Sequence, residues 1–237
     1  LAEPEARANQ LRVLEEIATG YPVQGLELDF ASHPGGSPAY LLPEDVEAGN
    51  PLVTEHVRRI SEMVRGQPGT PGLVGARVPN VESMCRAQGL DIRTWLGEGL
   101  VDYVVPMMYL NLQVDTQMNI DWLVEAAQEA EVSVYGMLQP FVDVGPPGAK
   151  YMEHFSPEVM RAAASNFLER GADGVYTWFL NWPLGPAEHS MLTEMGDPDL
   201  LKERTKRYLL PRRHEEAAGW GYDAVLPIEV ERADPDR

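Results

Sequence analysis

The sequence predicts an α/β fold, specifically a partial TIM (β/α)8 barrel made of about the last five βα units. Apolar strand-like segments alternate with helical segments along residues 1–196, as they do in proteins with a parallel sheet. The connections before strands are short, whereas residues 31–50 and 142–155 form long loops rich in Pro and Gly. Such asymmetry is typical of a barrel with a functional C-terminal face. An open doubly wound sheet remains the alternative, although no Gly-rich phosphate loop follows any predicted strand.

Five segments have the apolar, β-branched and aromatic composition of strands, and they recur at intervals suited to βα units. In chain order they are Val23–Phe30, Leu73–Val78, Val101–Tyr109, Val132–Phe141 and Gly174–Trp182.

Helices are predicted between these strands. Val53, Val57 and Ile60 recur at three- and four-residue spacing, which indicates one apolar helix face. Ser156 followed by Pro157 is typical of a helix start, because Ser caps the first turn and Pro fits its first position. The predicted helices are Glu3–Ile17, Pro51–Val64, Leu90–Glu98, Ile120–Glu131 and Ser156–Arg170.

The two ends of the chain suggest a piece of a longer protein. The sequence opens without an initiator Met, directly in an amphipathic helix, so we expect three barrel units in front and leave localisation open. Residues 1–196 are the predicted partial barrel, and residues 197–237 a C-terminal helix and extension. In that extension, Leu200–Leu210 reads as a basic helix and Ala224–Val230 as the start of a lost β-domain.

Composition excludes several function classes. The 37 acidic residues outweigh 19 basic ones, for a formal charge of −18, so nucleic acids and anionic membranes are poor partners. The single cysteine, Cys85, excludes an internal disulfide framework and a CxxC metal site. The five histidines are scattered, and no run of about 18 apolar residues could insert into a membrane. We therefore expect no metal and no cofactor, and the oligomeric state stays open.

Two acids stand near the end of the first predicted strand. Glu27 and Asp29 alternate with Leu26, Leu28 and Phe30, so both carboxylates share one face of the strand. Burying a carboxylate is costly unless it is paired or used, and parallel barrels place chemistry at C-terminal strand ends. This indicates an active or binding site. The alternative is structural: Asp29 accepting N–H groups of the next loop, and Glu27 pairing with an Arg of a neighbouring strand.

Other polar and aromatic residues follow the same ends of the predicted strands. Aromatic rings can stack on sugar rings, and amide, carboxylate and guanidinium groups can bond sugar hydroxyls. Core packing is the alternative for Trp178 and Tyr103. The candidate substrate-binding residues are His33, Arg77, Tyr109, Asn111, Gln139, Trp178, Asn181 and Trp182, and Asp143 and Asp115 are further loop acids.

Three sequence segments resemble segments of a known protein family. GLELDF with the following HP, VDYVVPMMY and GADGVYTWFLNW resemble the C-terminal half of glycoside-hydrolase-like (β/α)8 barrels near the family 10 glycosidases, over roughly residues 10–195. Similar acid-bearing strands recur in family 18 chitinases. The resemblance implies that Asp29, at the end of barrel strand four, is a catalytic or sugar-contacting acid, and it slightly favours an extracytoplasmic location.

The chain departs from both families at the second acid. Family 10 enzymes have Glu at the ends of strands four and seven, where this sequence has Asp29 and Gln139, and Gln cannot be a nucleophile. The final Glu of the chitinase pattern is replaced by Ala31. The second carboxylate then comes from Asp143 or Asp115, or the domain binds glycan without cutting it.

The sequence therefore predicts a carbohydrate-active enzyme that hydrolyses O-glycosyl bonds of a polysaccharide or glycoconjugate in the full-length parent protein. Asp29 is the predicted catalytic carboxylate, Glu27 tunes its pKa from beneath, and Asp143 is the candidate partner. The alternative is a non-catalytic glycan-binding or structural barrel of a larger protein.

Overall fold

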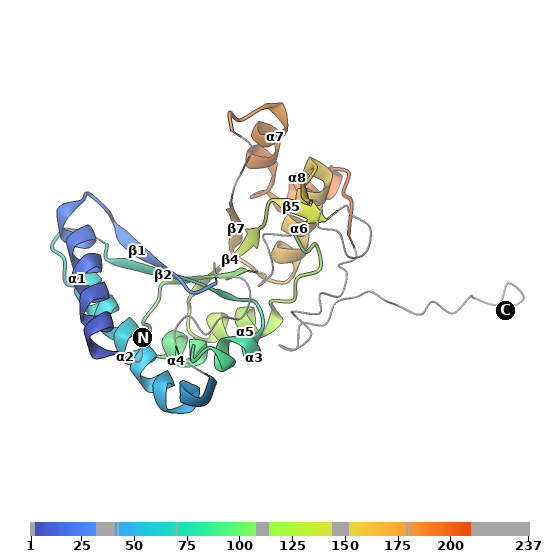
Figure 1. Ribbon diagram of the computed structural model, residues 1–237. Helices are drawn as coiled ribbons and strands as arrows, with labels where there is room; N and C mark the ends of the chain where they lie inside the picture. Colours follow the sequence, from blue (N-terminus) through green and yellow to red (C-terminus); the bar gives the residue numbers. More distant parts are fainter. Residues whose placement is uncertain are drawn as a thin grey trace, which may run out of the picture.

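The computed structural model describes residues 3–31, 41, 43–69, 71–107, 114–143, 152–178, 180 and 182–209. Five strands form one parallel sheet whose order follows the chain (Figure 1). This confirms the predicted α/β class and the pairing of consecutive strands. The strands are β1 (Gly25–Asp29), β2 (Leu73–Pro79), β3 (Tyr103–Met107), β4 (Ser133–Leu138) and β7 (Gly174–Thr177).

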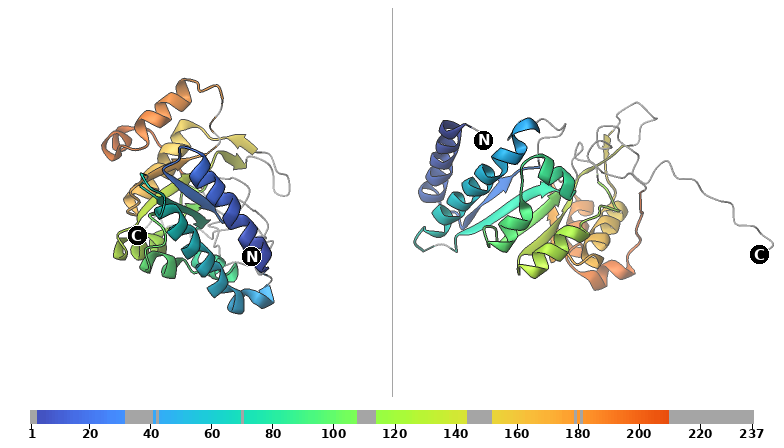
Figure 2. Two further views of the ribbon diagram at one scale, coloured as in Figure 1. Left: turned by 90° about the vertical axis from the view of Figure 1, so that its left-hand side faces the viewer. Right: turned by 90° about the horizontal axis from the view of Figure 1, so that it is seen from below.

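Helices α1 to α6 lie in a layer on one side of this sheet (Figure 1). Seen from below, α1, α2, α4, α5 and α6 follow one another in chain order (Figure 2, right). Their bounds are α1 (Pro4–Gly20), α2 (Val46–Arg65), α3 (Glu82–Ala87), α4 (Ile92–Gly97), α5 (Asp121–Glu129), α6 (Pro157–Glu169), α7 (Pro186–Glu194) and α8 (Pro198–Glu203). A 3-10 turn (Pro43–Asp45) precedes α2, and an antiparallel hairpin of β5 (Phe141–Asp143) and β6 (Met152–His154) separates β4 from α6.

The main core lies between the sheet and this helix layer. Alternate strand residues such as Leu28, Val74 and Val104 are buried there against apolar helix residues, among them Val57 and Phe167. Each parallel strand therefore sends one set of side chains to the helices and the other set to the opposite face of the sheet.

Three helices turn into the next strand in the same way. Gly99, Glu131 and Gly171 follow α4, α5 and α6 with φ of 63°, 57° and 94°. After each, a backbone N–H reaches back into the helix, as Ala172 does to the Phe167 carbonyl at 3.0 Å. Left-handed residues of this kind end helices by satisfying the last carbonyls. The short connections predicted from sequence are thus tight caps.

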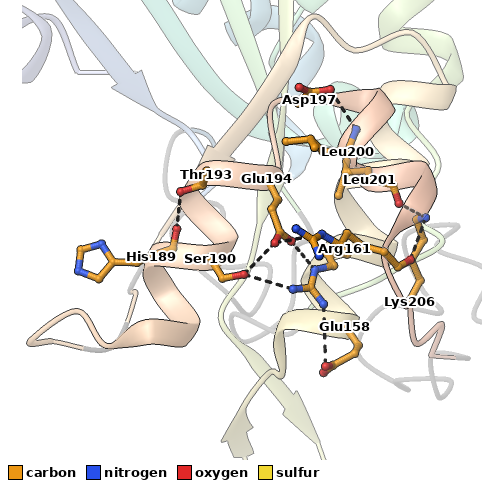
Figure 3. Close-up of polar contacts among 11 residues, drawn as sticks. Glu158, Arg161, His189, Ser190, Thr193, Glu194, Asp197, Leu200, Leu201 and Lys206 are labelled. Atoms are coloured by element: carbon orange, nitrogen blue, oxygen red, sulfur yellow. Dashed lines mark hydrogen bonds and ion pairs between the residues drawn. The ribbon is translucent and has the colours of Figure 1, made fainter.

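An ion-pair cluster ties α6, α7 and α8 together (Figure 3). Arg161 of α6 donates from Nε to Glu194 Oε2 at 2.7 Å, and Ser190 donates to Glu194 Oε1 at 2.9 Å. Arg204, just after α8, lies 3.3 Å from the same carboxylate. Burial alone would raise the pKa of Glu194, but the bonds from Arg161 and Ser190 outweigh it and hold the pKa below its usual value.

Some predicted boundaries were wrong. The segment Leu200–Leu210 is not one helix, because α8 begins at Pro198, ends at Glu203 and gives way to extended chain. The second helix begins at Val46 rather than Pro51, so Pro51 lies inside the helix, where it cannot donate the backbone hydrogen bond to the carbonyl four residues earlier. The sequence analysis did not predict α3, α7 or the β5–β6 hairpin, and Ala224–Val230 lies outside the described residues.

Candidate functional site

The face of the sheet opposite the helices carries a separate cluster of side chains. Ala31, Val105, Met107 and Met137 are buried on it, and partly buried aromatic rings pack against them: Tyr103, Tyr135, Tyr176 and Trp178. Strand alternation places Glu27, Asp29 and Arg77 on this same face. We call it the concave face, because the sheet curves around it.

A hydrogen bond across the sheet shows the curvature. Tyr176 of β7 donates to Glu27 Oε1 of β1 at 3.2 Å, although these strands lie at opposite edges of the sheet. In a flat sheet they would be ~19 Å apart, four strand spacings of about 4.8 Å each. The two edge strands therefore curve toward each other.

Glu27 is the centre of the concave face. Tyr103 donates to its Oε2 at 3.1 Å and Tyr176 to its Oε1 at 3.2 Å, and Arg77 Nε lies 2.8 Å from Oε1. Its side chain is 17% exposed. The two phenol hydrogen bonds and the guanidinium together hold the Glu27 carboxylate in one position.

Gly75 makes the Tyr103 contact possible. In the strand register, Glu27 on β1 pairs with Gly75 on β2, which pairs with Tyr103 on β3. The Tyr103 ring crosses β2 above Gly75, and a Cβ there would lie 2.1 Å from the ring carbon Cζ. Only glycine leaves room for a side chain of β3 to reach an acid on β1.

Asp29 sits one step nearer the C-terminal edge, beside Arg77. The two residues are register partners, and Arg77 Nη2 lies 3.0 Å from Asp29 Oδ2. Asp29 Oδ1 accepts the Ala31 N–H at 3.0 Å. A quarter of the Asp29 side chain is exposed, which makes it the more accessible of the two acids.

Arg77 links the opposite edges of the sheet. Its guanidinium carbon lies 5.2 Å from the centre of the Trp178 ring, just beyond β7, while its nitrogens face Glu27 and Asp29 on β1. A cation over an aromatic face is attracted by the ring quadrupole. One arginine thus holds both acids and the tryptophan in a fixed arrangement.

The tyrosines stay protonated beside Glu27. Burial, and then the negative charge of Glu27, raise the pKa of both Tyr103 and Tyr176 above the usual phenol value. Both phenols therefore remain hydrogen-bond donors across the range in which proteins work.

Of the candidate residues, the structure brings Glu27, Asp29, Arg77 and Trp178 together. Trp182 is 84% exposed beyond β7, whereas Gln139, directly after β4, is fully buried. Asp115 is also buried and accepts the Gln117 N–H at 2.7 Å within its own turn. Asp143 ends β5, with its side chain outside the description, and four other candidates lie outside the described residues: His33, Tyr109, Asn111 and Asn181.

Sequence reasoning missed Tyr176, Tyr135 and Gly75 as parts of this face. Tyr176 has the same strand parity as Trp178, so alternation alone could have found it. The need for glycine at position 75 depends on which strands are neighbours, and one strand's own sequence does not show that.

Both contacts of the structural alternative are also present. Asp29 accepts a loop N–H, and Glu27 pairs with an arginine of the neighbouring strand. These contacts are compatible with a binding face, because an active site also requires its side chains to be held rigidly.

Within the described part of the chain, no three His, Cys, Asp or Glu side chains are grouped so as to hold a metal ion. No described helix has the length and apolarity needed to span a membrane.

Comparison with known proteins gives little guidance. No family model matches the sequence, and no curated protein matches it. Among solved structures, the chitinase domain of the spore coat protein CotE from Clostridium difficile aligns with a TM-score of 0.39 and 14% identity, covering 85% of this chain and 72% of that one. The resemblance to family 10 stays a prediction from the motifs.

Proposed function

We propose that this chain is the carbohydrate-active part of a glycoside hydrolase, and that its concave face binds the sugar. The observation that carries the proposal is Asp29, a carboxylate with a quarter of its side chain exposed at the C-terminal end of β1, held by Arg77 beside the Trp178 ring. A sugar ring needs an apolar surface for its faces and charged or polar groups for its hydroxyls. Both kinds of group meet here at the end of a parallel sheet where ligands usually bind.

We also propose that the five βα units belong to a (β/α)8 barrel. In a closed barrel of eight strands, strands four positions apart face each other, and their side chains fill the interior. The contact of Glu27 with Tyr176 joins strands that are four positions apart in the sheet order, which supports this placement.

The acids take different roles in this proposal. Asp29 is the principal catalytic carboxylate, and Glu27 positions Arg77 beneath it. Arg77 places a positive charge between the two acids. Glycoside hydrolysis needs a second carboxylate at a set separation. Asp115 is bonded within its own turn, so Asp143 is the better candidate.

A second candidate function is glycan binding without cleavage. It is favoured by Gln139, which stands where the resemblance leads one to expect a second acid and which is fully buried. In that case Asp29 and Arg77 would bond sugar hydroxyls and Trp182, 84% exposed, would stack on a sugar ring.

The test is a screen of the protein that contains this chain against neutral polysaccharides, followed by Asp29→Asn on any substrate that it cleaves. The amide cannot ionise, so we expect kcat to fall by about 10²–10⁴-fold with the fold intact. Asp199→Asn on the exposed surface of α8 is the matched control and should leave kcat unchanged. Near-normal turnover by Asp29→Asn would refute its catalytic role.

Binding measurements separate the two candidates. If no glycan is cleaved but one is bound, and if Trp182→Ala weakens that binding, the non-catalytic function is the better account. If Asp29→Asn unfolds the protein instead, the acid pair is structural.

A further inference from the structure

The charges of the concave face leave a negative balance. The described strand residues place two carboxylates on it, Glu27 and Asp29, against one guanidinium, Arg77. Tyr103 and Tyr176 add no charge, because burial and the nearby Glu27 raise their pKa values above the usual phenol value. The described strands therefore give this face a net charge of −1.

Among the described strand residues of this face, the one cation is Arg77, and it is already paired with both acids. Arg77 Nε faces Glu27 at 2.8 Å, Nη2 faces Asp29 at 3.0 Å, and the guanidinium carbon lies over the Trp178 ring. Proteins that bind uronic acids or sulfates usually offer Arg or Lys donors that a carboxylate or sulfate can take. Here, an acidic ligand would have to compete with two fixed carboxylates for the same guanidinium.

The burial and the aromatic residues around Arg77 further disfavour an acidic ligand. The Arg77 and Glu27 side chains are 19% and 17% exposed, so solvent screens their field less than it would at an open surface. Aromatic rings are also part of this face: Tyr103, Tyr135 and Tyr176 pack against the same cluster as Trp178. Aromatic faces attract the C–H faces of uncharged sugars and repel anions.

We propose, building on the proposed glycan-binding function, that the concave face selects glycans without acidic groups. Uncharged sugars are accepted, and the same sugars with carboxylates are rejected. The selectivity is set by the surplus carboxylate at Asp29, the more exposed of the two acids.

The experiment measures binding to pairs of oligosaccharides by calorimetry. Each pair is a neutral β-glucan, β-mannan or chitin oligosaccharide and the same chain with C6 oxidised to a carboxylate. We expect at least one neutral oligosaccharide to bind and its oxidised partner to bind about tenfold more weakly or worse, the effect of one nearby like charge at intermediate dielectric. Equal or tighter binding of the oxidised partner overturns the selectivity while leaving glycan binding in place.

A pair of charge-matched variants locates the effect. Asp29→Asn should reduce the difference in affinity between neutral and oxidised ligands. Glu62→Gln, on an exposed position of α2 in the helix layer, removes the same charge and should leave that difference unchanged. If both variants narrow it equally, the overall charge of −18 causes the discrimination, and the proposal fails. If no oligosaccharide of either kind binds, the proposed function fails as well.

Discussion

At the residue scale, the concave face depends on one small residue as much as on its charged ones. Tyr103 reaches Glu27 only because Gly75 leaves the space above β2 empty. The phenol then supplies one of the donors that keep a half-buried carboxylate satisfied.

Tyr103→Phe tests this contact with little change in volume. It removes one donor to Glu27, so we expect the free energy of unfolding to fall by about 1–2 kcal/mol, measured by chemical denaturation. Gly75→Ala should cost more, because its Cβ would displace the Tyr103 ring as well as the hydrogen bond. Equal stability of all three proteins would show that Glu27 does not need this donor.

Glu131 offers a stabilising change at the same scale. It occupies the left-handed region with φ of 57°, where the other helix-to-strand turns use glycine. We expect Glu131→Gly to raise the free energy of unfolding by about 0.5–1 kcal/mol, because a side chain is strained in this conformation. Glu131→Ala is the control for the lost charge and should not stabilise the protein.

At the scale of elements, the ion-pair cluster around Glu194 links α7 and α8 to α6, which packs on the sheet. Glu194 is 5% exposed and touches Arg161, Ser190 and Arg204 (Figure 3). A buried carboxylate is tolerable only while these partners stay in place. The cluster therefore makes the packing of α6, α7 and α8 sensitive to pH.

The sign of this pH dependence follows from the pKa of Glu194, which is below its usual value of 4.5 in the folded protein. The folded state binds its proton more weakly than the unfolded chain. The contribution of the ionised Glu194 to stability is therefore fully present above pH 4.5 and is lost as pH falls through the lower folded pKa. We expect Glu194→Gln to flatten the acid limb of a melting-temperature profile. Glu203→Gln, exposed on α8, should leave it unchanged, and an unaltered acid limb in Glu194→Gln would contradict the assignment.

At the scale of the whole molecule, unpaired strand edges and net charge have opposite effects on association. In the described residues, β1 and β7 each pair with one strand only, and unpaired strand edges favour association. The net charge of −18 opposes it.

We therefore expect the 237-residue chain, expressed alone, to associate more as salt screens this repulsion. Light scattering after gel filtration at low and high ionic strength measures it. A monodisperse monomer with a sharp, cooperative melt at both salt concentrations would contradict this expectation.

The sequence by itself determined the α/β class, the order of five parallel strands and the placing of Glu27 and Asp29 on one strand face. These features follow from local periodicity, because a strand alternates its side chains and a helix repeats every 3.6 residues. Short elements such as α3 and the β5–β6 hairpin carry too few residues for such a period to show. The hydrogen bonds of Glu27 to Tyr103 and Tyr176, the Arg77 contact with Trp178 and the need for glycine at position 75 join residues of separate strands. Only the tertiary structure decided them, because they depend on strand register and on how far the sheet curves.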